Sequence, residues 1–237
     1  MTELLYQTDA YMKTTTARII GVDEEQNAVL LDKTIFYPGG GGQPADTGKL
    51  TDTATGLVSV VKTVKRGNLH VIEGQLPQLG AEVLCEIDWH TRYKLMRTHT
   101  ALHVLCGVIW HTFGASVTGG NMEPLKGRMD FEFERMQKEL VQEIDQLINE
   151  AAAKAYPVKT EILPRAEAFE IPDLIRTKVN LLPEGIEQVR TVEIVGLDLQ
   201  ACGGTHLKNT SEIGRINVTD YKSKGGINKR LYIELDA

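Results

Sequence analysis

The chain has 237 residues, of which 42% are hydrophobic and 24% charged, a composition typical of a globular protein with one large domain or two ordinary ones. It contains no run of about 18 consecutive apolar residues and no apolar stretch near its amino terminus, so we expect neither a membrane span nor a secretory signal. Three scattered cysteines are too few for a disulfide framework, which favours a reducing, cytoplasmic setting.

The formal net charge of −6 argues at first against a nucleic-acid partner. Two short segments, 89–97 and 221–230, nevertheless carry several cations and no acid, and such stripes can contact phosphates. Ordinary solvated surface charge is the alternative interpretation. The candidate RNA-binding cations are Arg92, Lys94, Arg97, Lys222, Lys224, Lys229 and Arg230.

The first 88 residues show short apolar runs separated by turns. This spacing predicts a small β-barrel or a sandwich. The expected strands are 15–21, 28–31, 58–64, 69–72 and 83–87.

From Trp89 the apolar spacing becomes helical. We predict one helix from Trp89 to about His111 and a second from about Glu134 to Ala155, where Pro157 follows. Helices followed by strands indicate an α+β fold with a domain boundary near residue 88, giving domains 1–88 and 89–237. The later strands are expected at 128–134, 158–163, 188–195, 213–219 and 231–235.

The strongest chemical signal is a pair of short motifs that each place two metal-binding side chains four residues apart. His99 and His103 lie one turn apart on the first predicted helix, so their imidazoles share a face. Cys202 and His206 flank Gly203 and Gly204 at a spacing that zinc ligands use. A set of three histidines and one cysteine suits tetrahedral zinc, so we expect these residues to bind one Zn²⁺.

Other interpretations of these residues stay open. Two histidines at this spacing can form a polar patch or a hydrogen-bonded core pair, and Cys106 is either a rival ligand or a small core residue. A zinc protease needs glutamate directly after the first histidine, where this chain has Thr100, so that class is disfavoured. Four protein ligands make a closed site, so the metal is either structural or shares the position of a loose ligand with water or substrate.

Two further segments are rich in glycine. Segment 36–48 contains four consecutive glycines, but it lacks the spacing and the hydroxyl of a Walker loop, so we expect no ATP site. A tight turn in the barrel is the alternative interpretation. Segment 117–121 follows the first helix and could line a polar pocket, although a loop is the simpler interpretation.

In this order the motifs resemble the editing domain of alanyl-tRNA synthetase and its freestanding relatives, the AlaX proteins. The resemblance extends from about Ile19 to Leu235 and includes the barrel motif, which is typical of the medium-length AlaX class. Threonyl-tRNA synthetase has a similar editing module but lacks that motif. The matching residues are the four zinc ligands, Gly41, Gly42, Gln43, Asp46 and Gly48 of the barrel motif, the strand 128–133 and the basic ending 224–230.

The resemblance implies a trans-editing deacylase that hydrolyses the ester between serine, or glycine, and alanine tRNA. It implies that Thr118 contacts the seryl hydroxyl, and it makes the backbone N–H groups near Gly119, Gly120, Gly203 and Gly204 candidate oxyanion donors. No Asp or Glu adjoins the ligand pairs, so the sequence identifies no general base. A non-catalytic zinc-stabilised RNA-binding module and a small-molecule esterase or amidase are the alternatives, and the sequence does not indicate the oligomeric state.

Overall fold

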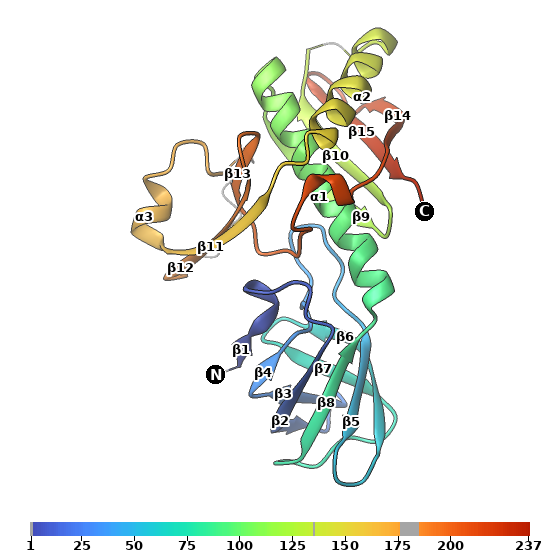
Figure 1. The fold of residues 1–237 in the computed structure, drawn as a ribbon, viewed down its shortest axis with the longest axis vertical. Helices are drawn as coiled ribbons and strands as arrows, with labels where there is room; N and C mark the ends of the chain where they lie inside the picture. Colours follow the sequence, from blue (N-terminus) through green and yellow to red (C-terminus); the bar gives the residue numbers. More distant parts are fainter. Residues whose placement is uncertain (1, 135, 176–184) are drawn as a thin grey trace. The chain divides into compact units, whose positions relative to one another are not determined.

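The computed structural model describes residues 2–134, 136–175 and 185–237 (Figure 1). The chain divides into two compact units, Met1–Tyr93 and Lys94–Ala237. The division falls inside helix α1 (Trp89–Phe113), slightly beyond the boundary expected near residue 88. The α+β class with an N-terminal barrel is confirmed. Within the described ranges, no helix has the length and apolar character needed to cross a membrane.

The first unit is a closed barrel in the strand order β2-β3-β7-β6-β5-β8. A short parallel pair, β1 (Glu3–Leu4) with β4 (Lys33–Thr34), accompanies it, as does a 3₁₀ turn at Leu5–Gln7. The barrel strands are β2 (Thr14–Asp23), β3 (Ala28–Leu31), β5 (Gly48–Asp52), β6 (Val58–Lys65), β7 (Leu69–Glu73) and β8 (Glu82–Ile87).

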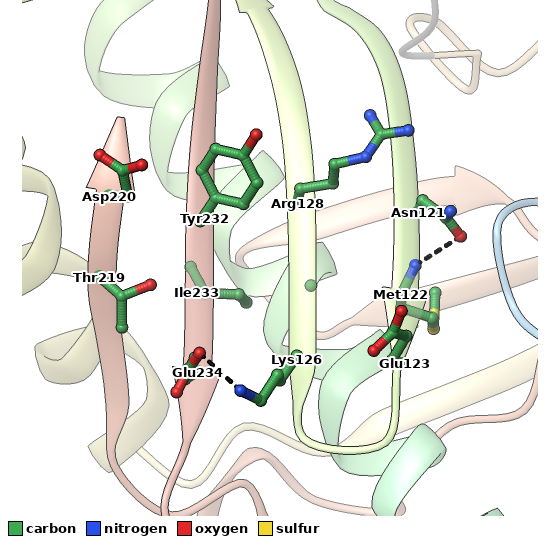
Figure 2. Close-up of a pocket in the computed structure, with 11 residues that line it drawn as sticks. Asn121, Met122, Glu123, Lys126, Arg128, Thr219, Asp220, Tyr232, Ile233 and Glu234 are labelled. Carbon is green, nitrogen blue, oxygen red and sulfur yellow. Dashed lines mark hydrogen bonds and ion pairs between the residues drawn. The ribbon is translucent and has the colours of Figure 1, made fainter. Parts of the chain in front are cut away.

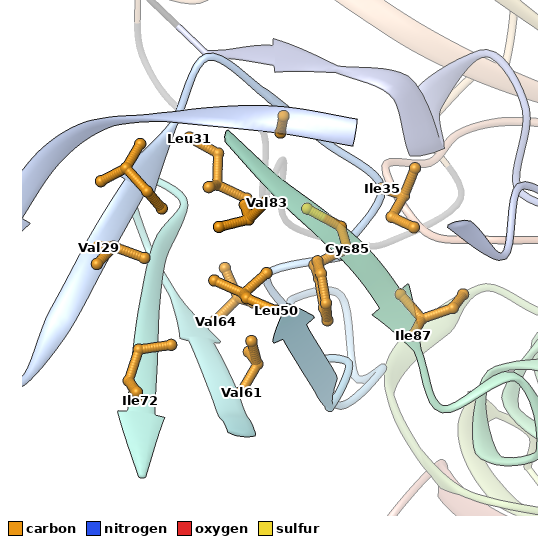
Figure 3. Packing of buried hydrophobic residues seen from close by; sticks show 13 residues of the cluster. Val29, Leu31, Ile35, Leu50, Val61, Val64, Ile72, Val83, Cys85 and Ile87 are labelled. Atoms are coloured by element: carbon orange, nitrogen blue, oxygen red, sulfur yellow. The ribbon is translucent and has the colours of Figure 1, made fainter. Parts of the chain in front are cut away.

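Alternating side chains of these strands fill the barrel. In β8, Val83, Cys85 and Ile87 are buried while the residues between them are more exposed, as the two-residue period of a strand requires. Figure 3 shows these three meeting aliphatic side chains from the other strands, including Leu50 and Val61. One face of each strand thus supplies the barrel core.

The second unit contains two antiparallel sheets, ordered β14-β15-β10-β9 and β11-β12-β13. Helix α1 packs on one face of the larger sheet, because a Cβ added at Gly127 of β10 would lie 3.1 Å from Leu102 of α1. The other elements are β9 (Val117–Glu123), β10 (Lys126–Glu132), α2 (Lys138–Ala153), β11 (Val158–Pro164), α3 (Arg165–Phe169), β12 (Gln188–Ile194), β13 (Asp198–Ala201), β14 (Ile216–Ser223) and β15 (Asn228–Leu235), with a 3₁₀ turn at Thr210–Glu212.

The structure corrects several expected elements. Segment 117–121, expected to be a loop, belongs to strand β9, which pairs with β10 despite its two glycines. Helix α2 begins at Lys138, later than predicted. Strands β5 and β13 and helix α3 were not predicted, since each is short and mixes polar or charged residues with apolar ones, and therefore shows no clear apolar pattern.

Candidate metal centre

Helix α1 supplies the first half of the site. Its stretch from Ala101 to Ile109 is buried on all sides, which explains why its apolar residues extend beyond one stripe. His99 and His103 are 6% and 5% exposed, so the histidine pair lies in the interior and is not a surface patch. Their ring centroids are 5.2 Å apart. Cys106, the rival ligand, is a buried core residue outside the cluster described below.

The second half comes from the loop that follows β13. Arg190 of β12 lies under this loop and donates through Nη1 to the carbonyl oxygens of Cys202 and Gly204, both at 2.8 Å. The N–H of Cys202 donates in return to the carbonyl oxygen of Arg190 at 3.0 Å. These three bonds fix the loop backbone that carries Cys202 and His206. Sequence reasoning missed Arg190.

The two halves converge. One ligand atom from each of His99, His103, Cys202 and His206 lies within 4.8 Å of the other three. Cys202 Sγ is 3.6 Å from His99 Nε2 and 3.3 Å from His206 Nε2. Two imidazole nitrogens at these distances from one sulfur have the proximity that a shared ion requires, and a thiolate with three imidazoles is a donor set that zinc favours. The residues therefore fit a zinc ion.

Two of these histidines also form a hydrogen bond through Nδ1, the second nitrogen of the ring. His206 Nδ1 lies 3.3 Å from Thr100 Oγ1, which in turn accepts the N–H of Leu207 at 3.1 Å. His103 Nδ1 lies 3.1 Å from Asp198 Oδ2. Sequence reasoning missed Asp198, although the two-residue period of an extended strand puts Asp198, Gln200 and Cys202 on one side.

The side chains of the cluster shift one another's pKa values. Burial disfavours a thiolate at Cys202, but the charges of His99 and His206 and hydrogen bonds from the imidazoles outweigh it and hold the pKa of Cys202 well below its ordinary value. Burial and the neighbouring charge of His99 lower the pKa of His206, which favours a neutral imidazole. Burial also opposes a proton on His103, but bonds to Asp198 and Cys202 raise its pKa to about 10. A thiolate and a neutral imidazole are the protonation states that bind metal.

Thr118, the residue expected to bind the seryl hydroxyl, lies in strand β9. The Thr118 hydroxyl donates to Asn228 Oδ1 at 2.9 Å. Asn228 alternates in β15 with buried Lys229, so it faces away from α1. Gly119 lies opposite Asp130 in the ladder and Gly120 opposite Met129. This hydrogen bond occupies the Thr118 hydroxyl in the free protein, and the expected contact of Thr118 with a seryl hydroxyl stays a prediction.

The glycine-rich motif of segment 36–48 lies in the barrel unit, where hydrogen bonds to Asp46 hold it in place. Asp46 is 3% exposed and accepts the N–H of Tyr37 at 2.6 Å. It also accepts two bonds from Arg92 Nε, at 2.9 and 3.0 Å. Gln43 is buried and closes a backbone turn with Gly40, beside exposed Gly41 and half-buried Gly42. At Gly48 a Cβ would lie 2.8 Å from Ile87 Cα, so close packing of β5 on β8 requires glycine there.

Several expected RNA-binding cations are engaged inside the protein. Arg92 is fully buried and bound to Asp46, which corrects its assignment as a phosphate contact. Lys229 is buried, with its ammonium donating to the carbonyl oxygen of Gly226. Arg230 forms a two-bond pair with Asp130 at 2.6 and 2.7 Å.

The other expected cations are partly or fully accessible. Arg97 is half-buried and donates to the carbonyl oxygens of Ile213 and Asp236. Lys94 is half-buried, and Lys222 and Lys224 are exposed. The two exposed lysines are thus best placed to contact a phosphate.

A separate hollow of about 300 Å³ lies on the open face of the larger sheet. Figure 2 shows Asn121, Arg128 and Tyr232 in a row across its strands. Beside that row, Lys126 pairs with Glu234 at 2.9 Å. Within the described chain, the lining of this hollow does not include the four metal-binding candidates.

Comparison with known proteins defines the class to which this fold and site belong. Residues 189–232 match the threonyl and alanyl tRNA synthetase second additional domain, and residues 7–91 match the family of class II (A) tRNA synthetases. The chain is therefore related to the synthetases in both units.

Full-length relatives identify the family. The chain is 38% identical over 242 residues to the alanyl-tRNA editing protein AlaX-M of Methanosarcina barkeri, covering 99% of both proteins. It is 40% identical over 237 residues to AlaX-M of Saccharolobus solfataricus, covering 98% of both. It also matches 25% of the alanine–tRNA ligase of Pyrobaculum calidifontis at 39% identity, over 91% of this chain. The chain belongs to the AlaX-M family of alanyl-tRNA editing proteins.

Proposed function

We propose that this protein is a trans-editing deacylase that hydrolyses the ester of mischarged alanine tRNA, with Ser-tRNA(Ala) as its first substrate and Gly-tRNA(Ala) as its second. The observation that carries the proposal is the convergence of His99, His103, Cys202 and His206 within 4.8 Å, in a chain that belongs to an editing family. The reaction is a hydrolysis and consumes no ATP. Its tRNA substrate implies a cytoplasmic location.

Zinc is the proposed cofactor, held by the same four residues. When bound, it supplies a Lewis acid that can hold the amine or polarise the carbonyl of the aminoacyl group. The three histidines are buried and Cys202 is half-buried, which limits access of bulk water to this region and strengthens electrostatic interactions there.

The backbone of the Cys202 loop is the proposed oxyanion site. Arg190 binds the carbonyl oxygen of Cys202, and in a trans peptide the N–H of the next residue points the opposite way. The N–H of Gly203 is thus directed away from Arg190. A Cβ at Gly203 would meet nothing within 4 Å, so a substrate carbonyl has room to approach. Gly203, with Gly204 beside it, would stabilise the negative charge that develops on the attacked carbonyl.

The proposed RNA contacts are Lys222 and Lys224, together with Lys94. The two lysines lie on β14 and the turn after it, where Tyr221 and Ile227 are exposed as well. An exposed aromatic ring can stack on a base of an RNA end while the neighbouring cations contact its phosphates.

A deacylation assay tests the proposal. Alanine tRNA charged with serine, glycine or alanine is incubated with the protein and with Cys202→Ala, and release of the amino acid is followed. We expect rapid release of serine, slower release of glycine, little release of alanine and loss of activity in the variant. Binding of tRNA without release would favour the non-catalytic RNA-binding module. Hydrolysis of a simple seryl ester with no preference for the tRNA ester would favour a small-molecule esterase.

A further inference from the structure

One buried carboxylate, that of Asp198, contacts a candidate metal ligand but is not itself part of the ligand cluster. Asp198 is the first residue of β13, and its side chain is fully buried. Its Oδ2 lies 3.1 Å from His103 Nδ1 and accepts a 2.6 Å bond from Gln200 Nε2. A carboxylate in this position accepts a hydrogen bond from the imidazole, so Nδ1 of His103 carries a hydrogen and Nε2 is the nitrogen that can exchange its proton for a metal ion.

A glycine on α1 makes that approach possible. Gly107 lies one helical turn after His103, on the same face of the helix. A Cβ at Gly107 would lie 2.8 Å from the carbonyl oxygen of Leu197 and 3.0 Å from the Cβ of Asp198. Both distances are shorter than van der Waals contact allows, so any larger residue would displace the start of β13. The backbone of Leu197 and Asp198 therefore sits against α1 only because position 107 has no side chain.

The same strand also positions Cys202, another candidate ligand. Strand β13 begins at Asp198 and ends at Ala201, and Cys202 follows directly. A displacement of β13 would thus move the partner of His103 and the backbone of Cys202 together. The distance between the helix pair and the loop pair depends on how closely this strand approaches α1.

We propose that Asp198 is a positioning residue that sets the tautomer and the ring orientation of His103 for metal binding, and that Gly107 is required to admit it. The proposal rests on the zinc site of the proposed function. Partners that hold the second nitrogen of a metal-binding histidine typically change metal affinity by about 10- to 100-fold when they are removed.

The test measures zinc affinity. Purified wild type and variants compete for zinc with a chromophoric chelator, and the absorption spectrum of the cobalt-loaded protein reports the ligand geometry. Asp198→Asn keeps the shape and removes the charge, so we expect zinc to bind about 10-fold more weakly. Asp198→Leu also removes the acceptor, and we expect a loss of roughly 100-fold. Gly107→Ala should weaken zinc binding as well, and in the Asp198→Leu background it should cost less than it does alone, because only the displacement of Cys202 then remains to be lost.

Asp130→Asn is the matched control. Asp130 is a buried carboxylate of the same unit that pairs with Arg230, outside the metal cluster. This variant should lower the melting temperature but leave zinc affinity within about twofold. Folded Asp198→Asn and Asp198→Leu variants with wild-type zinc affinity and an unchanged cobalt spectrum would overturn the proposal, as would a wild type that binds no zinc. A wild type that binds zinc but does not deacylate tRNA would refute the proposed function alone, since the affinities would still decide the role of Asp198.

Discussion

Replacing Arg92 with methionine should destabilise the barrel unit strongly. The Arg92 side chain is fully buried, and its Nη groups donate to the carbonyl oxygens of Ala10 at 3.0 Å and Ile35 at 2.7 Å. Its Nε and Nη2 bind Asp46. Methionine retains much of the volume but leaves Asp46 buried without its counter-ion. Only the N–H of Tyr37, at 2.6 Å, remains among the bonds to this carboxylate described above.

The size of the effect follows from that uncompensated charge. Removing one partner of a buried ion pair costs about 3–5 kcal/mol. For a chain of this length each kcal/mol lowers the melting temperature by about 2–4 °C, so we expect a loss of roughly 6–20 °C. The chain has two tryptophans, Trp89 in the first unit and Trp110 in the second. Fluorescence melts in a Trp110→Phe background therefore report on the unit that contains Arg92.

Variants of Asp46, the partner of Arg92, and measurements of tRNA binding provide the controls for this prediction. Asp46→Asn should destabilise the unit to a similar extent, because it leaves the guanidinium uncompensated. Arg92→Met combined with Asp46→Leu should cost less than the sum of the single changes, because no charge stays buried. Below its melting temperature, Arg92→Met should bind tRNA with the wild-type salt dependence. A variant that melts like the wild type but binds tRNA more weakly would refute the reasoning and restore Arg92 as a phosphate contact.

Three further predictions concern the metal, the pH and the RNA. The wild type should contain about one equivalent of zinc by elemental analysis, and Cys202→Ala clearly less; an active, metal-free preparation would contradict this. Burial lowers the pKa of His70 from 6.5 to about 4, so the unfolded chain takes up a proton at higher pH than the folded barrel does. Between pH 6.5 and 4 the free energy of unfolding should therefore fall by on the order of 3 kcal/mol, and His70→Gln should remove most of that fall in urea titrations. Changing Lys222 and Lys224 to alanine should reduce the slope of log K against log salt by about one per lost phosphate contact, whereas arginine at both positions should preserve it.

The sequence predicts well those elements whose apolar residues stand out within a short stretch of the chain. The helix predicted from Trp89 to about His111 is α1, which ends at Phe113. The strand predicted at 28–31 has the same bounds in β3. Strand β9 was missed because its two glycines have low strand propensity, and pairing with β10 decides the outcome. Such pairing is a tertiary contact that no local window contains.

The site shows the same division. Spacing within each ligand pair is local, so His99 with His103 and Cys202 with His206 could be identified from the sequence, and the structure brings the pairs together. Arg92 was misassigned because a cluster of cations without acids resembles a basic surface. Its partner, Asp46, lies 46 residues earlier in the chain, and only the fold brings the two together.

The distance between the two ligand pairs is determined by contacts that involve main-chain oxygens. Arg190 holds the Cys202 loop through two carbonyl oxygens, and Gly107 admits the carbonyl oxygen of Leu197. Main-chain oxygens are present at every position whatever the side chain is. The spacing of a motif therefore cannot predict these contacts. The informative positions are instead the residues that use them: a buried arginine on the neighbouring strand and a glycine inside a helix, where glycine costs about 1 kcal/mol relative to alanine. A glycine at that cost, one turn after a candidate metal-binding histidine, indicates that the backbone of another segment packs against the helix there.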